Sequence, residues 1–182
     1  MDARDLRPED VVPLEGGQGP SLRSVLHAVT TFGVSTAFRE DVMRDADFPL
    51  AGDLPAFLAL NELIYRGVAR PAELADALDT GRSNVSKILQ RLEHAGLVVR
   101  GRDPGDGRSV VVVLTADGRD VGSRILRAVD QSSKLFSTWP ERDLAELHRL
   151  LLRLATDLDA LPRHTLREVT GIRLAGVYDS PV

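Results

Sequence analysis

The stretch Pro71–Thr115, PAELADALDTGRSNVSKILQRLEHAGLVVRGRDPGDGRSVVVVLT, decides the fold that we expect for this chain. Two short segments with a helical spacing of apolar residues meet at Asp79-Thr80-Gly81, and a strand, a glycine-rich loop and a second strand follow them. This order is typical of a winged helix-turn-helix, which places its second helix in the DNA major groove and its hairpin beside it. The stretch therefore predicts a DNA-binding module.

The second helix of the motif, predicted over residues 82–94, has one apolar and one polar face. Val85, Ile88, Leu89 and Leu92 recur at helical spacing and are expected to face the core. Arginine and lysine can bind guanine or phosphate, and asparagine and glutamine can match adenine, so the opposite face suits DNA. The DNA-binding candidates on this helix are Arg82, Ser83, Asn84, Ser86, Lys87, Gln90 and Arg91. A polar face on an arbitrary helix is usually only solvated, and it is the flanking turn and hairpin that favour DNA binding here.

The hairpin supplies a second group of candidates. Its loop, residues 101–107, carries the turn sequence Asp103-Pro104-Gly105-Asp106-Gly107. Arg102 and Arg108 flank the glycines, which allow a close approach of the backbone to a duplex. We expect Arg108 to enter the minor groove, where negative potential favours a guanidinium, and Asp106 to hold that guanidinium. Arg102, Asp106 and Arg108 complete the set of DNA-binding candidates.

Further helices are predicted on both sides of the motif. One runs from Ser21 to about Arg44, and another follows Asp53, a suitable N-cap, and stops at Gly67. Thr115 caps a long helix, Trp139-Pro140 interrupts it, and a leucine-rich helix follows. The expected fold is mostly α with a small β wing: a winged helix-turn-helix at 54–115 flanked by dimerisation helices at 21–46 and 116–161. Residues 1–20 are expected to form a mobile arm and residues 162–182 a tail.

Composition narrows the possible functions. The chain has 182 residues, no cysteine and a net charge of −4, and its N-terminus lacks the apolar segment of a secretory signal. Only residues 66–108 carry a positive balance, with eight Arg and Lys against six acidic residues. The four histidines are scattered without metal-ligand spacing, and no nucleotide-binding or hydrolase motif occurs. We therefore expect a cytoplasmic protein with no enzymatic activity, no catalytic residue, no cofactor, no metal and no membrane span.

Two motifs resemble those of the MarR family of bacterial transcriptional regulators. The family pattern L-E-x-x-G-L-V is present as Leu92–Val98, and D-P-x-D-x-R followed by a valine strand and L-T-x-x-G is present as Asp103–Gly118. The resemblance implies a homodimer that presents two recognition helices to a pseudo-palindromic operator in double-stranded DNA. It also implies repression that a small, often aromatic or anionic effector releases. The pattern departs at Asp79-Thr80-Gly81, where glycine, an apolar residue and a Ser or Thr cap are usual.

Two other functions compete with this one. The acidic net charge and the altered turn are compatible with a winged-helix protein-interaction module that has lost DNA binding. A nucleoid-type binder without sequence preference is the third hypothesis, although an acidic chain offers little non-specific affinity for DNA.

Overall fold

A computed structural model describes residues 21–102, 109–132, 136–160, 166 and 170–172 of the chain. The chain divides into two compact units, residues 1–39 and residues 40–182, and each is described by itself.

The first unit contains helix α1, Leu22–Gly33, and the beginning of helix α2, Thr36–Asp45. The prediction of one continuous helix from Ser21 to about Arg44 was wrong, because the chain breaks at Val34-Ser35. The Ser35 hydroxyl accepts a hydrogen bond from the Phe38 backbone N–H at 3.3 Å and so starts a new helix. Serine favours such caps because its side chain competes with the helical backbone bonds. The periodicity of the apolar residues did not reveal this break.

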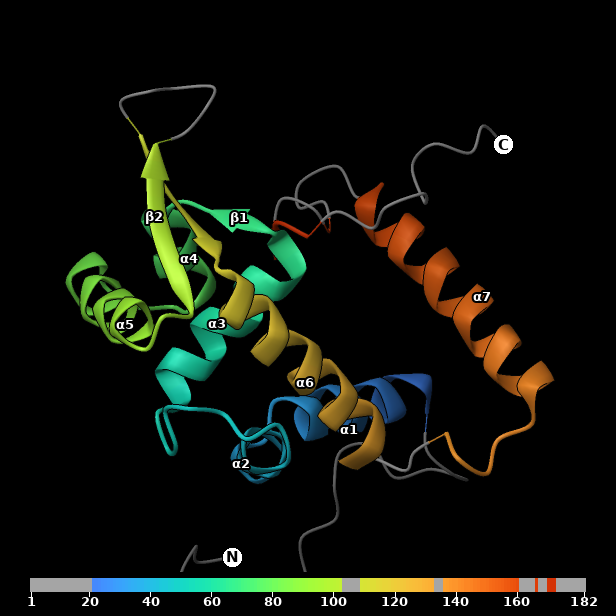
Figure 1. Cartoon of the computed structure of the whole chain (residues 1–182). Helices are drawn as coiled ribbons and strands as arrows, with labels where there is room; N and C mark the ends of the chain where they lie inside the picture. The colour runs from blue at the N-terminus through green and yellow to red at the C-terminus, as the bar shows by residue number, and fades with distance from the viewer. Residues whose placement is uncertain (1–20, 103–108, 133–135, 161–165, 167–169, 173–182) are drawn as a thin grey trace, which may run out of the picture. The chain divides into compact units, whose positions relative to one another are not determined.

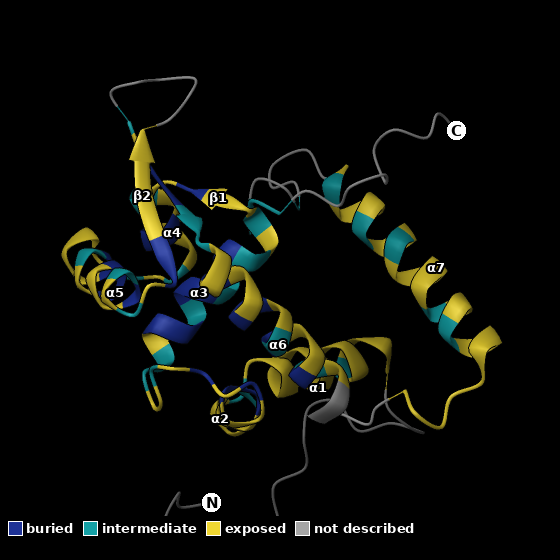
Figure 2. Ribbon diagram, in the orientation of Figure 1, coloured by how far each residue is buried: buried dark blue, intermediate teal, exposed yellow. Residues whose placement is uncertain are grey.

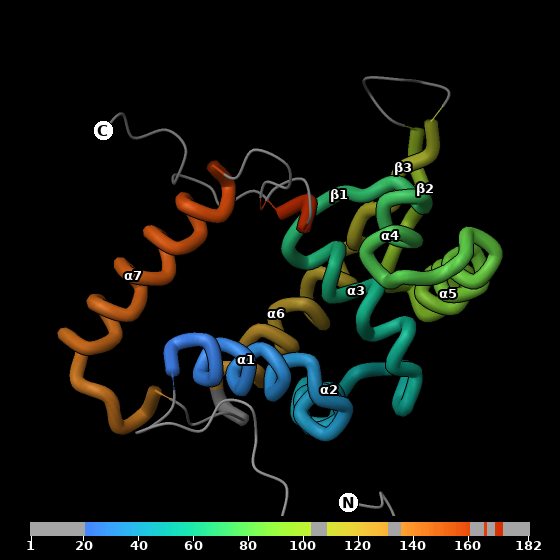
Figure 3. The backbone as a smooth tube through the Cα atoms, turned by 180° about the vertical axis from the view of Figure 1, so that it is seen from behind, coloured from blue at the N-terminus to red at the C-terminus, as the bar shows by residue number. Residues whose placement is uncertain are grey.

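The second unit is built around helix α3, Leu54–Arg66. Asp53 caps it as predicted: its carboxylate accepts a hydrogen bond from the Ala56 N–H at 3.1 Å. Gly67, with a φ of 74°, ends it as predicted. Helices α4, Pro71–Ala77, and α5, Arg82–His94, pack against each other and against α3 (Figures 1 and 3). Their fully buried side chains include Leu60, Leu63, Leu74, Ile88, Leu89 and Leu92.

A three-stranded antiparallel sheet with the strand order β1-β3-β2 forms the wing. Strand β2, Val98–Arg102, pairs with β3, Val110–Leu114, so the predicted hairpin is confirmed. Strand β1, Val68–Ala69, adds to the free edge of β3 and was not predicted. Two residues are too few to show an alternating pattern, and only the pairing partner defines them as a strand.

Helix α6, Ala116–Ser132, follows the wing and contacts both α3 and β3. It begins at a very close approach, since a Cβ placed on Gly118 would lie 1.9 Å from the Leu97 carbonyl oxygen. Helix α7, Glu141–Asp159, has no buried residue, and Figure 2 shows it almost entirely in the exposed and intermediate colours. In the described part of the chain, no helix has the length and apolar character needed to cross a membrane.

Candidate nucleic-acid interface

Helix α5 starts at a turn that substitutes for the usual cap. Gly81 stands at the N-cap position and offers no side-chain hydrogen bond, and Asp79 adopts a positive φ of 47° to close the turn. The amide of Asn84 donates to the Thr80 hydroxyl at 2.9 Å. The Thr80 hydroxyl, which departs from the MarR pattern, therefore has a partner inside the turn. Asn84 is thus both a predicted DNA-binding residue and a component of the turn.

The first two and a half turns of α5 present a polar face to solvent. Val85, Ile88 and Leu89 are buried, as predicted, and this fixes which side of the helix faces outward. Five of the predicted DNA-binding side chains lie on the outer side, and among the described residues they make no side-chain hydrogen bond or ion pair: Arg82, Ser83, Ser86, Lys87 and Gln90. Unpaired donors on a rigid helix retain their full capacity for base edges and phosphates.

Arg91 differs from the other candidates because its side chain binds Asp53, the N-cap residue of α3. Its guanidinium donates to both carboxylate oxygens of Asp53, from Nε at 2.5 Å and from Nη2 at 3.0 Å. The hydrogen bond from Arg91 holds the pKa of the Asp53 carboxyl below its usual value, and the Ala56 N–H acts in the same direction. The same contact raises the pKa of Arg91. These two residues are 38 positions apart in the sequence, so no local sequence pattern could predict that they form an ion pair.

The wing is joined to the end of α5 by a second ion pair. The Nε of Arg100 in β2 lies 3.0 Å from a carboxylate oxygen of Glu93. Arg102, a predicted DNA-binding residue, lies exposed at the end of β2. Asp106 and Arg108, the other two candidates in the wing, lie outside the described residues.

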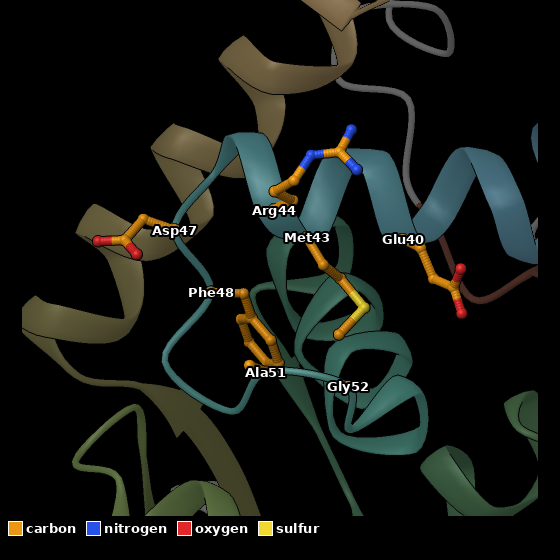
Figure 4. Close-up of a pocket in the computed structure, with 7 residues that line it drawn as sticks. All are labelled: Glu40, Met43, Arg44, Asp47, Phe48, Ala51 and Gly52. Atoms are coloured by element: carbon orange, nitrogen blue, oxygen red, sulfur yellow. The ribbon is translucent and has the colours of Figure 1, made fainter.

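Two hollows in the second unit involve residues that the sequence did not single out. Leu50 and His94 border a hollow of about 490 Å³ beside Lys87, Gln90 and Arg91 of α5. A second hollow, of about 360 Å³, lies at the end of α2 and the loop after it (Figure 4). The side chains of Met43 and Phe48 extend toward the Ala51-Gly52 segment of that loop (Figure 4). The loop after α2 contributes Leu50 to the first hollow and Ala51 and Gly52 to the second. The spacing of apolar residues in the sequence does not reveal such hollows, because they form only when the chain folds.

A helix-turn-helix with an outward polar face, followed by a wing, defines the class of winged helix-turn-helix transcriptional regulators. The family model described as MarR family matches residues 53–109. The HTH-type transcriptional repressor Rv2887 of Mycobacterium tuberculosis is 33% identical over 112 residues, which are 60% of this chain and 79% of the relative. The regulator PecS of Dickeya dadantii is 32% identical over 89 residues, 48% of this chain and 54% of the relative. This chain belongs to the MarR family.

Solved structures agree with this assignment at the level of the fold. The multiple antibiotic resistance repressor MarR superposes with a TM-score of 0.57 at 23% identity, covering 75% of this chain and 96% of that one. RV1404 from Mycobacterium tuberculosis superposes with a TM-score of 0.56 at 22% identity, covering 80% and 99%. The predicted fold class and the family resemblance are confirmed, and the chain is a transcriptional regulator of this family, not an enzyme.

Proposed function

We propose that the chain is a homodimeric, sequence-specific regulator that represses transcription from a pseudo-palindromic operator. In this proposal α5 lies in the major groove and the wing lies against the minor groove. The observation that carries it is the row of five polar side chains on α5 that have no partner among the described residues, because that face is presented by a helix whose other side is fully buried. Ser83, Ser86 and Lys87 are then the contacts nearest to the bases and phosphates of each half-site.

Selection of binding sites from a random duplex pool tests this proposal. An enriched inverted repeat with half-sites about one helical turn, roughly 34 Å, apart supports a dimeric regulator. A pool without any enrichment at low salt rejects sequence-specific binding. In that case a protein-interaction role predicts no salt-dependent binding of any duplex, and a nucleoid-type role predicts equal affinity for selected and random duplexes.

The selected duplex then allows a test of the groove contacts. Lys87→Gln should weaken binding and lower the slope of log K against log salt by about 0.9, because one phosphate contact is lost. Arg127→Gln is the matched control, since it removes an exposed cation from α6. An unchanged slope for Lys87→Gln, or an equal change for both variants, contradicts the placement of α5 in the groove.

The dimer is supported by apolar faces on the two outer helices. On α1 the exposed apolar side chains are Leu22, Val25, Leu26, Val29 and Phe32, and on α7 they are Leu150, Leu151, Leu154 and Leu158. A soluble monomer rarely leaves such contiguous apolar surface in water. Sedimentation equilibrium should give twice the chain mass, and Leu151→Glu should shift the mass toward that of one chain. A wild-type chain that sediments as a monomer at the concentration used for DNA binding contradicts the dimer.

Release by an effector is supported by the hollow in Figure 4. Met43 and Phe48, both buried, give it an apolar floor, and the exposed guanidinium of Arg44 lies at its border. Glu40 and Asp47 are the other charged residues at its border, and Arg44 is itself paired with Asp41. A pocket of this size with an apolar floor suits single-ring ligands. A series of neutral and anionic single-ring aromatic compounds added to the protein–operator complex tests this part. Release by at least one member is expected, and a complex insensitive to the whole series contradicts it.

A further inference from the structure

We infer that Asp53 is a positioning residue for DNA binding, and that its carboxylate, acting through Arg91, fixes the orientation of α5 relative to the duplex. This inference rests on the proposed function and adds to it a residue that lies outside the recognition helix, at the N-terminus of α3. It also gives Arg91 a different role from the DNA contact that its position on the polar face suggests.

The carboxylate of Asp53 makes three contacts that join two helices. One oxygen accepts from the Ala56 N–H, which belongs to the first turn of α3, and both oxygens accept from Arg91 in the last turn of α5. The Asp53 side chain is only 20% exposed, so its position is set by α3 and not by solvent. A paired, charge-assisted contact of this kind constrains direction as well as distance. The last turn of α5 is therefore held at a fixed angle to α3.

The other polar side-chain contacts described for α5 do not reach α3, because Glu93 pairs with Arg100 of β2 and Asn84 bonds to Thr80 in the turn. The inner face of α5 packs through buried apolar side chains, namely Val85, Ile88, Leu89 and Leu92. Such packing resists separation of the helix from the core, but it is not directional. Ser83 lies eight residues before Arg91, about 12 Å along the helix axis. A tilt of about 10° around the last turn would move the Ser83 region by about 2 Å. Hydrogen bonds to base edges do not tolerate such a displacement.

A phosphate contact would require Arg91 to leave Asp53. Two of its N–H donors are already used there, and the net charge of the pair is zero. Leaving would deprive a partly buried carboxylate of its cationic partner, which is unfavourable. The observed pairing therefore favours a role for Arg91 inside the protein.

Two variants separate the alternatives. Asp53→Asn keeps a side chain that caps helices as well as aspartate does but removes the charge that pairs with Arg91. If Arg91 contacts phosphate, this variant frees it and removes a negative charge, so that the duplex should bind more tightly. If Asp53 positions α5, the same variant should bind more weakly, by about tenfold. The two interpretations differ in the sign of the effect.

The full-length wild-type chain, Asp53→Asn, Arg91→Gln and the double variant are compared by titration of the selected duplex at several salt concentrations. We expect both single variants to weaken binding equally, the double variant to be no weaker than either, and all salt slopes to equal that of wild type. Lys87→Gln is the control that must lower the slope. Tighter binding by Asp53→Asn, a slope reduced by about 0.9 in Arg91→Gln, or additive losses would overturn the inference.

A measurement without DNA keeps this inference separable from the proposed function. Wild-type protein that binds no duplex refutes the proposed function, whatever the variants do. Amide hydrogen exchange of the last turn of α5 then reports whether Asp53 holds it. We expect faster exchange in Asp53→Asn and Arg91→Gln to the same extent, without further increase in the double variant. Exchange equal to wild type in both single variants overturns the inference.

Discussion

Replacing Gly118 by alanine should destabilise the protein strongly, although Gly118 lies in a helix where alanine is intrinsically favoured. Its Cβ would lie 1.9 Å from the Leu97 carbonyl oxygen and 2.9 Å from the carbonyl carbon. Both are backbone atoms, so no side-chain rotation can relieve the overlap. The first turn of α6 must instead move away from Leu97 by more than an ångström.

That movement would disrupt hydrogen bonds at the same junction. The Thr115 N–H donates to the Leu97 carbonyl at 3.1 Å, and the Thr115 hydroxyl donates to the Gly96 carbonyl at 2.6 Å. Two such bonds contribute about 2 kcal/mol, and overpacking in a dense region costs about 1–3 kcal/mol. The higher helix propensity of alanine offsets about 1 kcal/mol of this loss. We expect the free energy of unfolding to fall by about 2–4 kcal/mol.

Urea denaturation of the wild type and Gly118→Ala, followed by circular dichroism, measures this difference. Gly122→Ala is the matched control, because it lies one turn further along α6 and its Cβ would meet only the Ile64 side chain, at 3.0 Å. We expect Gly122→Ala to stay within about 1 kcal/mol of the wild type, since a side chain can move and alanine favours the helix. Equal stability of Gly118→Ala and the wild type would refute the reasoning.

Two further predictions concern the ion pairs of α5. Because Arg91 lowers the pKa of Asp53 below its ordinary 3.8, the stabilisation from Asp53 is fully present above that pH and is lost as the pH falls through the lower, folded-state pKa. The difference in unfolding free energy between wild type and Asp53→Asn should therefore be larger at about pH 6 than at about pH 2, and a difference independent of pH would contradict the pairing. Glu93→Gln should cost less than about 1 kcal/mol, because both partners are about one-third exposed, and Arg100→Gln should add nothing to it in urea denaturation. Additive losses from Glu93→Gln and Arg100→Gln would show that the two side chains do not interact.

Local sequence patterns predicted most of the elements of this protein. Helix α5 begins and ends at the residues that its apolar spacing indicated, and Asp53 and Gly67 bound α3 as expected for a cap and a stop. These features depend on neighbours within about four positions, which is the range over which a helix places side chains on one face. The same patterns failed at Val34-Ser35, where α1 ends and the Ser35 hydroxyl caps the start of α2.

The sequence predicted which residues form the polar face of α5, but only the tertiary structure shows which of them have partners inside the protein. Arg91 and Lys87 are both cations on that face, yet Arg91 meets Asp53 from 38 residues away and Lys87 meets no described partner. Strand β1 exists only because β3 pairs with it, and the need for glycine at position 118 comes from the Leu97 carbonyl. Such contacts join residues that are distant in the chain. Spacing determines which face a residue occupies, whereas folding determines what that face meets.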